Sequence, residues 1–374
     1  MRVVALRLNH FRNLSGLDLS SLGRANVLVG KNAQGKTNIL EAIFIAASGE
    51  SFRMTQDRYL VQKGEVDAQV FMETVTDDER EKFVQLFWVV DGETVSKSVK
   101  LNALVVPRAD LVKTIPVVIF SPEDIDLVRL SPSHRRKFLN LAIARHDAEY
   151  RQDLMEYTRI WRQRNQLLLL IKQGREAEEE LDVWDNQLAE AGARIVRKRA
   201  DFVSDIAREV GEHYKTFVPN GNGAELRLKY QPSIGLPNKN EYLEYLRRVR
   251  RLDIARVTTT HGIHRDDLMF ILNDSDVRYT ASRGEFRSAV LALKLAEGKY
   301  LHDKLGDRPV FLLDDAFSEL DDDRKVALAE EIKRYQVFVT TNDANIATLF
   351  ERPRTYEVIK GAVVGSVEET VKGD

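Results

Sequence analysis

Two short stretches of this chain carry residue types that suit the chemistry of phosphate groups and their counter-ions. The first combines two glycines with a lysine and a threonine, and it reads Gly30, Lys31, Asn32, Ala33, Gln34, Gly35, Lys36, Thr37 and Asn38. Glycine lets the backbone approach phosphate oxygens closely, so that its N–H groups can donate to them. At this spacing the Lys36 ammonium would reach the β- and γ-phosphates of a nucleotide, and the Thr37 hydroxyl would bind Mg²⁺. The stretch therefore predicts a phosphate loop that binds a nucleotide.

The second stretch is an apolar run, residues 310–313, that ends in the carboxylates Asp314 and Asp315. A buried strand has no structural need for two acids at its carboxyl end, and ligand crevices of open α/β sheets lie at that edge. Asp314 would hold the Mg²⁺ shell, and Asp315 would orient or deprotonate an attacking water. The alternative is a turn that happens to be acidic. The phosphate loop in the same chain favours the functional interpretation.

The elements around these residues are those that such a site needs. A short apolar strand at 26–29 leads into the phosphate loop, and apolar residues at helical spacing follow over 39–46. Another apolar strand is predicted at 337–341, and an antiparallel sheet with a hairpin turn at Asp91 and Gly92 is predicted after the loop helix. A glycine-rich turn before a core helix would explain the loop alone, but it would not explain this strand–loop–helix order. The fold class is therefore α/β.

Composition restricts the class of protein further. The chain has 374 residues, of which 43% are hydrophobic and 30% charged, and its net charge is −2. Such a length favours two lobes. No apolar run is long enough to span a membrane, and the first residues lack the pattern of a signal peptide. Cysteine is absent, which excludes disulfides and thiolate metal sites. We therefore expect a cytoplasmic protein without membrane partners.

A helical insert is predicted from Ser133 to about Thr216, as an antiparallel pair of helices that turns at Gly174. Its first helix is rich in arginine, and a second basic cluster lies between Arg247 and Arg256. Either cluster could follow a DNA backbone, or could simply be a solvated helix face. No zinc-finger spacing or recognition-helix pattern is present, so any DNA contact would be mainly to phosphates.

Three further segments have more than one interpretation. Arg12 and Asn13 form a turn that could lie over a nucleotide or be solvated. Ser282 and Gly284 precede a helix, where they could bind an anion or only cap the helix. His264, Arg265 and Asp266 resemble a kinase catalytic loop, but the other kinase motifs are missing. His264 is therefore expected to be a structural residue.

These motifs together resemble the RecF family of bacterial recombination-mediator ATPases, which is related to ABC and SMC heads. The resemblance covers nearly the whole chain in family order. It rests on residues 11–13, 35–38, 51–53, 120–124, 131–136, 264–267, 282–284 and 313–321.

The resemblance implies an ABC- or SMC-head-type P-loop NTPase with an inserted helical lobe. Lobe I would comprise residues 1–122 and 300–374, and lobe II residues 123–299. Ser282 and Gly284 would reach the γ-phosphate held by a second subunit, with Asp321 at that junction, so that ATP drives homodimerisation. The resemblance also implies binding of double-stranded and gapped DNA, partnership with RecR and RecO, weak Mg²⁺-dependent ATP hydrolysis and association with the nucleoid.

The chain departs from the family pattern at a few positions. Ile263 stands where the family usually has proline, and the family usually has glutamine near Glu285 and Phe286. No histidine follows Thr340 and Thr341, where many ABC ATPases carry one, so that Thr341 or Asn342 would take the switch position.

Other ATPase classes fit the sequence less well. A transporter or export subunit would need membrane-domain partners and should lack the segments around Ser121 and His264. An SMC head would carry coiled-coil arms far longer than 374 residues can contain. A small-molecule kinase would lack the Ser282 segment and Asp321.

Overall fold

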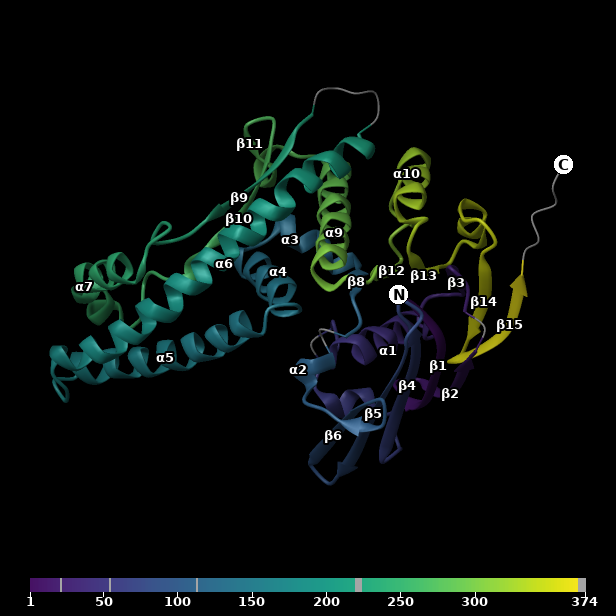
Figure 1. The fold of residues 1–374 in the computed structure, drawn as a ribbon, viewed down its shortest axis with the longest axis horizontal. Helices are drawn as coiled ribbons and strands as arrows, with labels where there is room; N and C mark the ends of the chain where they lie inside the picture. The colour runs from purple at the N-terminus through teal and green to yellow at the C-terminus, as the bar shows by residue number, and fades with distance from the viewer. Residues whose placement is uncertain (21, 54, 112–113, 219–223, 369–374) are drawn as a thin grey trace. The chain divides into compact units, whose positions relative to one another are not determined.

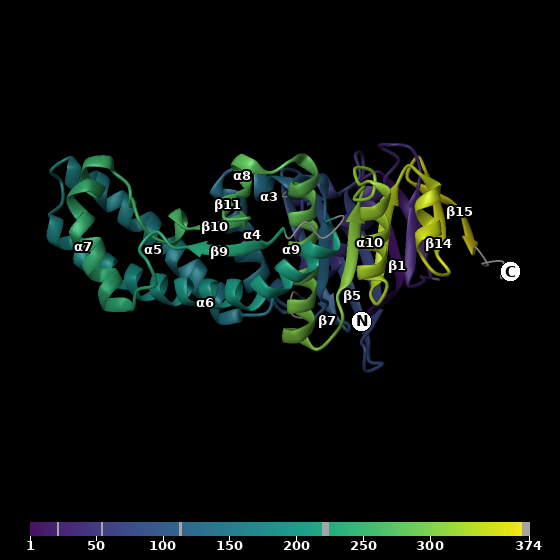
Figure 2. The same ribbon diagram turned by 90° about the horizontal axis from the view of Figure 1, so that it is seen from above.

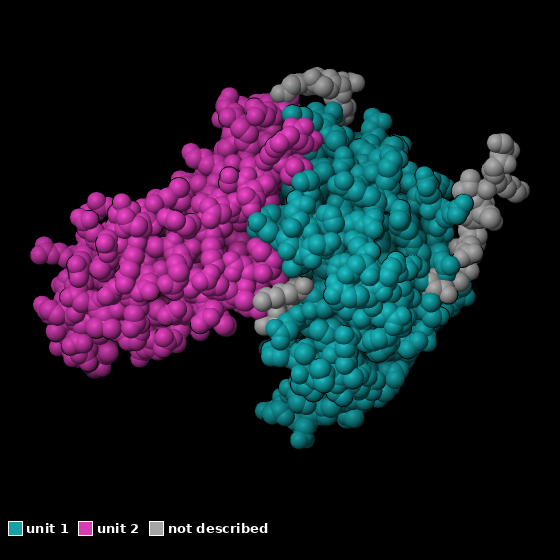
Figure 3. All heavy atoms as spheres, viewed as in Figure 1, with its two compact units in different colours: residues 1–124, 213–222, 291–374 teal, residues 125–212, 223–290 magenta. Residues whose placement is uncertain are grey.

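The computed structural model describes residues 1–20, 22–53, 55–111, 114–218 and 224–368. The chain forms two compact units, which Figure 3 shows in different colours. Unit 1 comprises residues 1–124, 213–222 and 291–374, and unit 2 comprises residues 125–212 and 223–290. These limits differ from the predicted boundaries at 122/123 and 299/300. The reason is packing, because Leu291, Leu295 and Phe217 contribute to a core of unit 1.

Unit 1 contains a six-stranded sheet, the nucleotide sheet, in which five adjacent strands are parallel (Figure 1). In spatial order its strands are β15 (Ala362–Glu368), β14 (Arg354–Ile359), β3 (Ala25–Val29), β13 (Gln336–Thr341), β12 (Val310–Asp314) and β8 (Val117–Phe120). Both neighbours of β3 thus come from the C-terminal part of the chain. β15 alone pairs in the antiparallel direction.

Side chains of the nucleotide sheet alternate between two cores, as the period-two geometry of strands requires. Val27 of β3 and Leu313 of β12 belong to a core shared with α9 (Arg283–Leu305) and α10 (Asp322–Ile332). Leu28 and Leu312 point to the opposite face, into a core that contains α1 (Lys36–Ser48). Because both faces are covered, the central residues of these strands are mainly apolar, which explains why the sequence shows runs rather than alternation.

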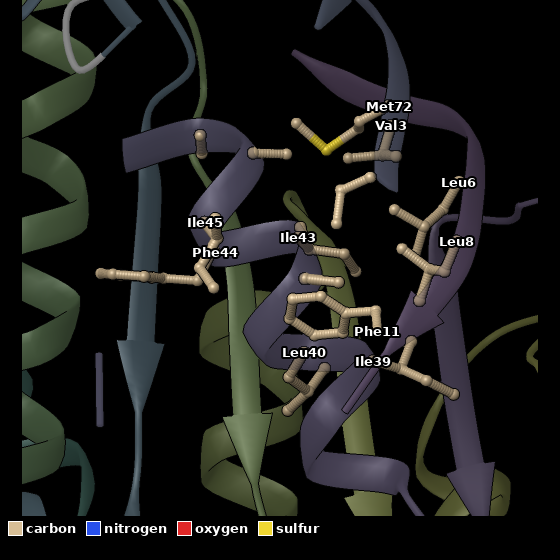
Figure 4. Packing of buried hydrophobic residues seen from close by; sticks show 14 of the residues in the cluster. Val3, Leu6, Leu8, Phe11, Ile39, Leu40, Ile43, Phe44, Ile45 and Met72 are labelled. Atoms are coloured by element: carbon tan, nitrogen blue, oxygen red, sulfur yellow. The ribbon is translucent and has the colours of Figure 1, made fainter. Parts of the chain in front are cut away.

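The second sheet of unit 1 is antiparallel and packs on the other side of α1. Its strands, in spatial order, are β2 (Leu14–Leu19), β1 (Arg2–Phe11), β4 (Asp67–Val75), β5 (Glu81–Asp91), β6 (Thr94–Leu101) and β7 (Leu104–Val105). The hairpin predicted at Asp91 and Gly92 joins β5 to β6, as expected. Figure 4 shows Ile39, Ile43 and other α1 side chains packed with those of β1 and β4. Short helices complete the unit: η1 (Asp57–Leu60), α2 (Arg108–Leu111), η2 (Pro122–Asp124) and η6 (Ala344–Leu349).

Unit 2 is mainly helical and contains one small antiparallel sheet, in the order β11-β10-β9. Its elements are α3 (Ile125–Arg129), α4 (Pro132–Ala144), α5 (Ala148–Lys172), η3 (Glu178–Glu180), most of α6 (Leu181–Thr216), β9 (Leu226–Gln231), α7 (Lys239–Arg256), η5 (Ile263–Arg265), β10 (Asp267–Leu272), β11 (Ser275–Asp276), α8 (Val277–Thr280) and the start of α9. Within the described ranges, no helix is both long and apolar enough to cross a membrane.

The predicted antiparallel helix pair is formed by α5 and α6 (Figures 1 and 2). Ion pairs connect the two helices in antiparallel register, since Asp153 contacts Arg194, Arg164 contacts Asp185 and Asp147 contacts Lys198. Gly174, at φ 68°, lies in the turn between the helices, as expected. Leucines close to that turn form a small core, namely Leu167, Leu168 and Leu181.

Candidate nucleotide-binding site

The phosphate loop connects β3 to α1 at the carboxyl end of the nucleotide sheet. Gly35 has φ 111° and forms the N-cap of α1, a conformation that side-chain-bearing residues rarely adopt. Gly30 lies against the neighbouring strand, where an added Cβ would meet the Val358 carbonyl oxygen at 2.4 Å. The Lys36 Nζ donates to the carbonyl oxygens of Gly30 (2.6 Å) and Lys31 (2.9 Å). The lysine therefore folds over the loop, where its ammonium would meet bound phosphate.

Asp314 lies at the end of β12 and accepts two hydroxyl hydrogen bonds on one oxygen. Thr37 Oγ1 donates to Asp314 Oδ1 at 2.7 Å, and Thr340 Oγ1 donates to the same atom at 2.7 Å. Asp314 is 8% exposed, and this burial raises its pKa above the usual range. Burial likewise lowers the pKa of Lys36. A hard cation beside Asp314 would offset the cost of burying its charge.

Thr37 and Asp314 are the residues that would hold Mg²⁺, since they are in contact and supply the oxygen ligands that this ion prefers. In the part of the chain that the structure describes, no group of three or more acidic or histidine side chains could hold a metal alone. The donor set therefore suits an ion that is bound jointly by protein oxygens and nucleotide phosphates. Such an ion would neutralise charge on the β- and γ-phosphates.

Asp315 is exposed, and its backbone has φ 52°, which is uncommon for a residue other than glycine. Its N–H donates to Thr340 Oγ1 at 2.9 Å, so the same threonine fixes both acids. Strained backbone of this kind is often found at functional sites. Thr340 was not predicted as a site residue, although its position at the carboxyl end of β13 parallels that of Asp314 on β12.

A buried glutamate on α1 connects the phosphate loop to residues from other segments. Glu41 is fully buried, and its two oxygens accept from Arg12 Nη2 (2.7 Å) and Nε (2.9 Å). Ser51 donates to it as well, and Arg53 Nη1 lies 3.5 Å away. Arg12 is thus engaged by a carboxylate, whereas Asn13 in the same turn is exposed.

Asn13 and Arg53 both contact Asn38, the residue that ends the predicted loop. Asn38 Nδ2 donates to Asn13 Oδ1 (2.7 Å), and Arg53 Nη1 donates to Asn38 Oδ1 (2.8 Å). Sequence reasoning gave no role to Arg53 or Glu41. The available signal was Glu41 itself, a single acid within the apolar run of α1.

The turn between β14 and β15 holds the middle of the phosphate loop. Lys360 N donates to Gln34 Oε1 (2.7 Å), and Gly361 N donates to Gln34 O (2.9 Å). Gly361 has φ 81°, and a Cβ there would lie 2.1 Å from the Asn13 carbonyl oxygen. Lys31, Asn32 and Ala33 remain exposed above this support. The turn between β14 and β15 therefore supports one side of the loop, and the side where a nucleotide would bind is open.

Comparison with known proteins agrees with this geometry. The family model described as RecF/RecN/SMC N terminal domain matches residues 2–361. The DNA replication and repair protein RecF of Heliobacterium modesticaldum is 37% identical over 91% of this chain and 92% of its own length. The RecF protein of Moorella thermoacetica is also 37% identical, over 95% of this chain and 94% of its own. The chain belongs to the RecF family.

Solved structures agree with this assignment. The recombination mediator protein RecF-ATPrS in the RecFOR pathway superposes with a TM-score of 0.88, at 31% identity, over 98% of each chain. An SMC head domain from Pyrococcus furiosus reaches a TM-score of 0.57 at 18% identity, over 98% of this chain and 96% of its own, which shows shared fold only. The fold is thus the P-loop ATPase fold of ABC and SMC heads, as the sequence predicted. As a member of the RecF family, the chain is of the ABC ATPase type.

The segment that the RecF-family resemblance assigned to a second subunit's γ-phosphate begins α9, in unit 2. Ser282 is exposed, and both its N–H and its hydroxyl donate to Glu285 Oε2 at 2.7 Å. Glu285 N donates back to Ser282 Oγ at 3.3 Å, which makes a capping box. Gly284 lies in the first turn of α9. The hydroxyl expected to meet phosphate is thus engaged by the unusual acid at 285.

The predicted junction and switch residues also have local partners. Asp321 caps α10 by accepting from Arg324 N at 2.9 Å. Thr341 Oγ1 accepts from Asp343 N at 3.0 Å, whereas Asn342 is exposed beside it.

Many arginines of the two predicted basic clusters of this RecF-family chain are structural. Arg135 forms a two-bond ion pair with Asp267, and the fully buried Arg164 contacts Asp185 and Asp253. Arg250 contacts Asp182 and Asp185. Packing of the helices buries Arg135 and Arg164, and Arg250 is held by two carboxylates, so these side chains are poor candidates for DNA contacts. Exposed arginines without a hydrogen-bond or ion-pair partner among the described residues are Arg159, Arg162, Arg248, Arg251 and Arg256, of which Arg248 lies over the ring of Tyr245.

Proposed function

We propose that this chain is an ATP-dependent DNA-binding protein of recombinational repair and replication restart. The observation that carries the proposal is the contact between Thr37 and Asp314, which are far apart in sequence and complete one metal-binding pair beside a phosphate loop. The relatives named above are DNA replication and repair proteins, and a related solved structure is a recombination mediator of the RecFOR pathway in complex with an ATP analogue. Both facts support the same role for this chain.

Each residue of the site has its own task in this proposal. Backbone N–H groups of residues 30–38 and the Lys36 ammonium bind the phosphates of ATP, and Thr37 and Asp314 bind Mg²⁺. Asp315 orients the attacking water, and Arg12 and Asn13 lie at the edge of the nucleotide site. Ser282 and Gly284 contact the γ-phosphate held by a second copy of the chain. ATP therefore drives dimerisation on double-stranded DNA, and slow hydrolysis releases the dimer.

The wider role follows from the family. The dimer would act with RecR and RecO at gapped DNA, where it would help to load the recombinase, and it would be associated with the nucleoid. Two related solved structures are of recombination mediator proteins in the RecFOR pathway, and this supports the proposed action with RecR and RecO.

Sedimentation tests the ATP-dependent step directly. The protein is measured without nucleotide, with ADP and with ATP and Mg²⁺, each with and without a short DNA duplex. We expect a dimer only with ATP, and more of it with duplex present. Lys36→Ala should remain monomeric throughout, because it removes the ammonium that binds the phosphates.

Asp315→Asn is the second variant in the same experiment, and it should affect hydrolysis instead of nucleotide binding. It should bind ATP and dimerise. Its rate of ATP hydrolysis should fall by about 10²-fold, as expected when a positioned acid or base is lost. A monomer in all conditions for the unaltered protein would contradict the proposed dimerisation. Unchanged turnover in Asp315→Asn would assign the catalytic acid elsewhere.

A further inference from the structure

A surface hollow in unit 2 is lined by polar and charged side chains. Its volume is about 730 Å³, and it lies where the segment after β9 meets the segment between α7 and η5. We call it the Arg265 hollow. Its lining consists of three hydroxyl side chains, one histidine and two arginines, namely Ser233, Thr258, Thr260, His261, Arg256 and Arg265. The Ser233 and Thr260 hydroxyls already donate to the Gly262 carbonyl oxygen and to Asp253, so the donors left for a ligand are mainly the two guanidinium groups and the Thr258 hydroxyl.

The two arginines of the Arg265 hollow carry charge that the structure does not neutralise. Arg256 and Arg265 are both exposed, and neither side chain has a hydrogen-bond or ion-pair partner among the residues described. This distinguishes them from Arg247 and Arg250 of α7, which contact Asp182. Unpaired arginines in a concave surface create a positive potential, which attracts anions.

The carboxylates nearest in sequence cannot supply the missing counter-charge, because other groups already occupy them. Asp253 is fully buried and accepts from Arg164 (2.8 Å), Thr260 Oγ1 (2.6 Å) and Thr260 N (2.9 Å). Asp266 is 1% exposed and accepts from Arg199 (2.8 Å) and from Ser233 N (2.9 Å). Each acid therefore has a buried arginine of its own, and the positive charge of the hollow remains.

The backbone that presents Arg265 is fixed on both sides by buried groups. His264 contacts the Tyr157 hydroxyl through Nδ1 (3.1 Å) and the Thr259 carbonyl oxygen through Nε2 (2.8 Å). Gly262, at φ 134°, donates to Ser233 Oγ (2.8 Å), which donates back to the Gly262 carbonyl oxygen (2.9 Å). Arg265 is thus an exposed cation between buried neighbours. A site fixed in this way loses little entropy when it binds.

We propose that the Arg265 hollow binds the phosphodiester backbone of double-stranded DNA. Guanidinium groups and hydroxyls are the side chains that contact backbone phosphates most often, and arginine matches phosphate with two hydrogen bonds. The lining has no tyrosine, tryptophan or phenylalanine on which a base could stack. The contact should therefore not depend on base sequence. This inference rests on the proposed DNA-binding function, and it names the residues that would carry it.

Duplex binding measured against salt concentration tests the assignment. The variant combines Arg256→Gln with Arg265→Gln in the full chain, and binding is measured from about 50 to about 200 mM salt, where phosphate contacts dominate. We expect a loss of about tenfold in affinity at the low end, and a log–log salt slope shallower by about 2, since each removed guanidinium leaves one phosphate without its cation. Unchanged melting and ATP-dependent dimerisation would show that the fold is intact.

The matched control combines Arg159→Gln with Arg162→Gln on α5, two exposed arginines that likewise have no partner in the described residues. If this control loses the salt slope and the Arg256 and Arg265 variant does not, the DNA surface lies on α5 and our inference is wrong. If the unaltered protein binds duplex and both variants bind it as tightly, the hollow is excluded as the DNA site, although the proposed DNA binding itself stands. If the unaltered protein binds no duplex, the proposed function fails, and the inference fails with it.

The phosphate groups that the hollow would bind can belong to DNA or be free phosphate. Binding of inorganic phosphate, measured beside binding of duplex, distinguishes these two ligands. If the hollow binds free phosphate alone, the variant at Arg256 and Arg265 should lose phosphate binding and keep its affinity for duplex, which would overturn the assignment to DNA. Loss of duplex binding in that variant, with phosphate competing only weakly in the unaltered protein, would support the assignment.

Discussion

At the scale of single residues, the groups that would perform chemistry are held at a cost to the fold. Asp314 carries a carboxylate whose pKa is raised by burial, and Asp315 has a backbone φ of 52°. Neither feature stabilises the folded chain. Both are understandable if the site is completed by a nucleotide and its cation, because these would offset the burial of charge. Sites that combine strain and buried charge are commonly functional for this reason.

Glu285 is the residue whose replacement tests the second-subunit contact most directly. Its carboxylate engages the Ser282 hydroxyl and would repel an approaching γ-phosphate. Glu285→Gln keeps the capping geometry but removes the charge. We therefore expect ATP-dependent dimerisation to strengthen by about threefold to tenfold, which corresponds to about 0.7–1.4 kcal/mol. Sedimentation at a series of protein concentrations measures this change.

The chain offers a matched control for Glu285 in α7, where Glu241 and Asn238 form the same capping box. Glu241→Gln should leave the dimerisation constant unchanged, since it alters the same kind of helix start elsewhere in unit 2. If Glu285→Gln weakens the dimer, or if the two variants behave alike, Ser282 does not meet phosphate in the manner proposed.

At the scale of elements, the segment 259–266 of unit 2 depends on a buried polar network. His264, Tyr157 and Tyr242 lie close together, and Arg199 and Asp266 form a buried ion pair nearby. Burial lowers the pKa of His264 to about 4, so the folded chain holds this histidine neutral. The prediction that His264 is a structural residue fits these contacts.

Acid should weaken this element in a defined pH range. The unfolded chain takes up a proton on His264 near pH 6.5, whereas the folded chain does so only near pH 4. The unfolded state therefore binds more protons between these values, and the free energy of unfolding should fall as the pH drops from about 6.5 to about 4. His264→Gln cannot ionise, so it should be less stable at pH 7.5 but lose about 1–3 kcal/mol less on acidification. Urea titrations at several pH values measure the difference.

His261 provides the comparison for that experiment, since it lies in the same segment but on the Arg265 hollow. His261→Gln is therefore measured in the same urea titrations. An equal loss of acid sensitivity in both variants would mean that burial of His264 is not its source.

Elements with local signals could be predicted from the sequence, and those built from distant partners could not. The phosphate loop, β12 with its two acids and the turn at Gly174 each carry their own pattern of glycine, apolar or acidic residues. Arg164 carries no such pattern, because nothing near it in sequence shows that Asp185 and Asp253 will bury it. Arg12 is similar, since its partner Glu41 looks like an ordinary helix residue until the fold places the two together. Sequence reasoning therefore treated Arg164 as a candidate DNA contact and Arg12 as a residue that could lie over a nucleotide.

At the scale of the whole molecule, the nucleotide site depends on the last hairpin of the chain. Gly361 lies against Asn13 and donates to Gln34, so the turn between β14 and β15 supports the phosphate loop from below. Gly361→Ala would place a methyl group 2.1 Å from the Asn13 carbonyl oxygen, at a residue with φ 81°. The turn must then shift, and we expect the affinity for ATP to fall about tenfold, the equivalent of about 1.4 kcal/mol. Calorimetric titration with ATP measures this loss.

Gly92→Ala is the control for this variant. Gly92 also lies in a hairpin turn with positive φ, at 57°, but a Cβ there would meet nothing within 4 Å. It carries the backbone cost of the substitution without the contact to the phosphate loop. Equal affinities for ATP in the two variants would show that the hairpin does not support the site.

The position of β3 between β13 and β14 has a consequence for the synthesis of the protein. Roughly 300 residues separate β3 from β13, and a ribosome that adds about 5–20 residues per second needs about 15–60 s to make them. Throughout that interval the nascent chain contains the whole phosphate loop but neither of the strands that flank it. Translation that stops early would therefore release a product that carries the complete ATP-binding motif and binds no ATP. Incomplete copies of the chain would thus be unable to compete for nucleotide with finished ones.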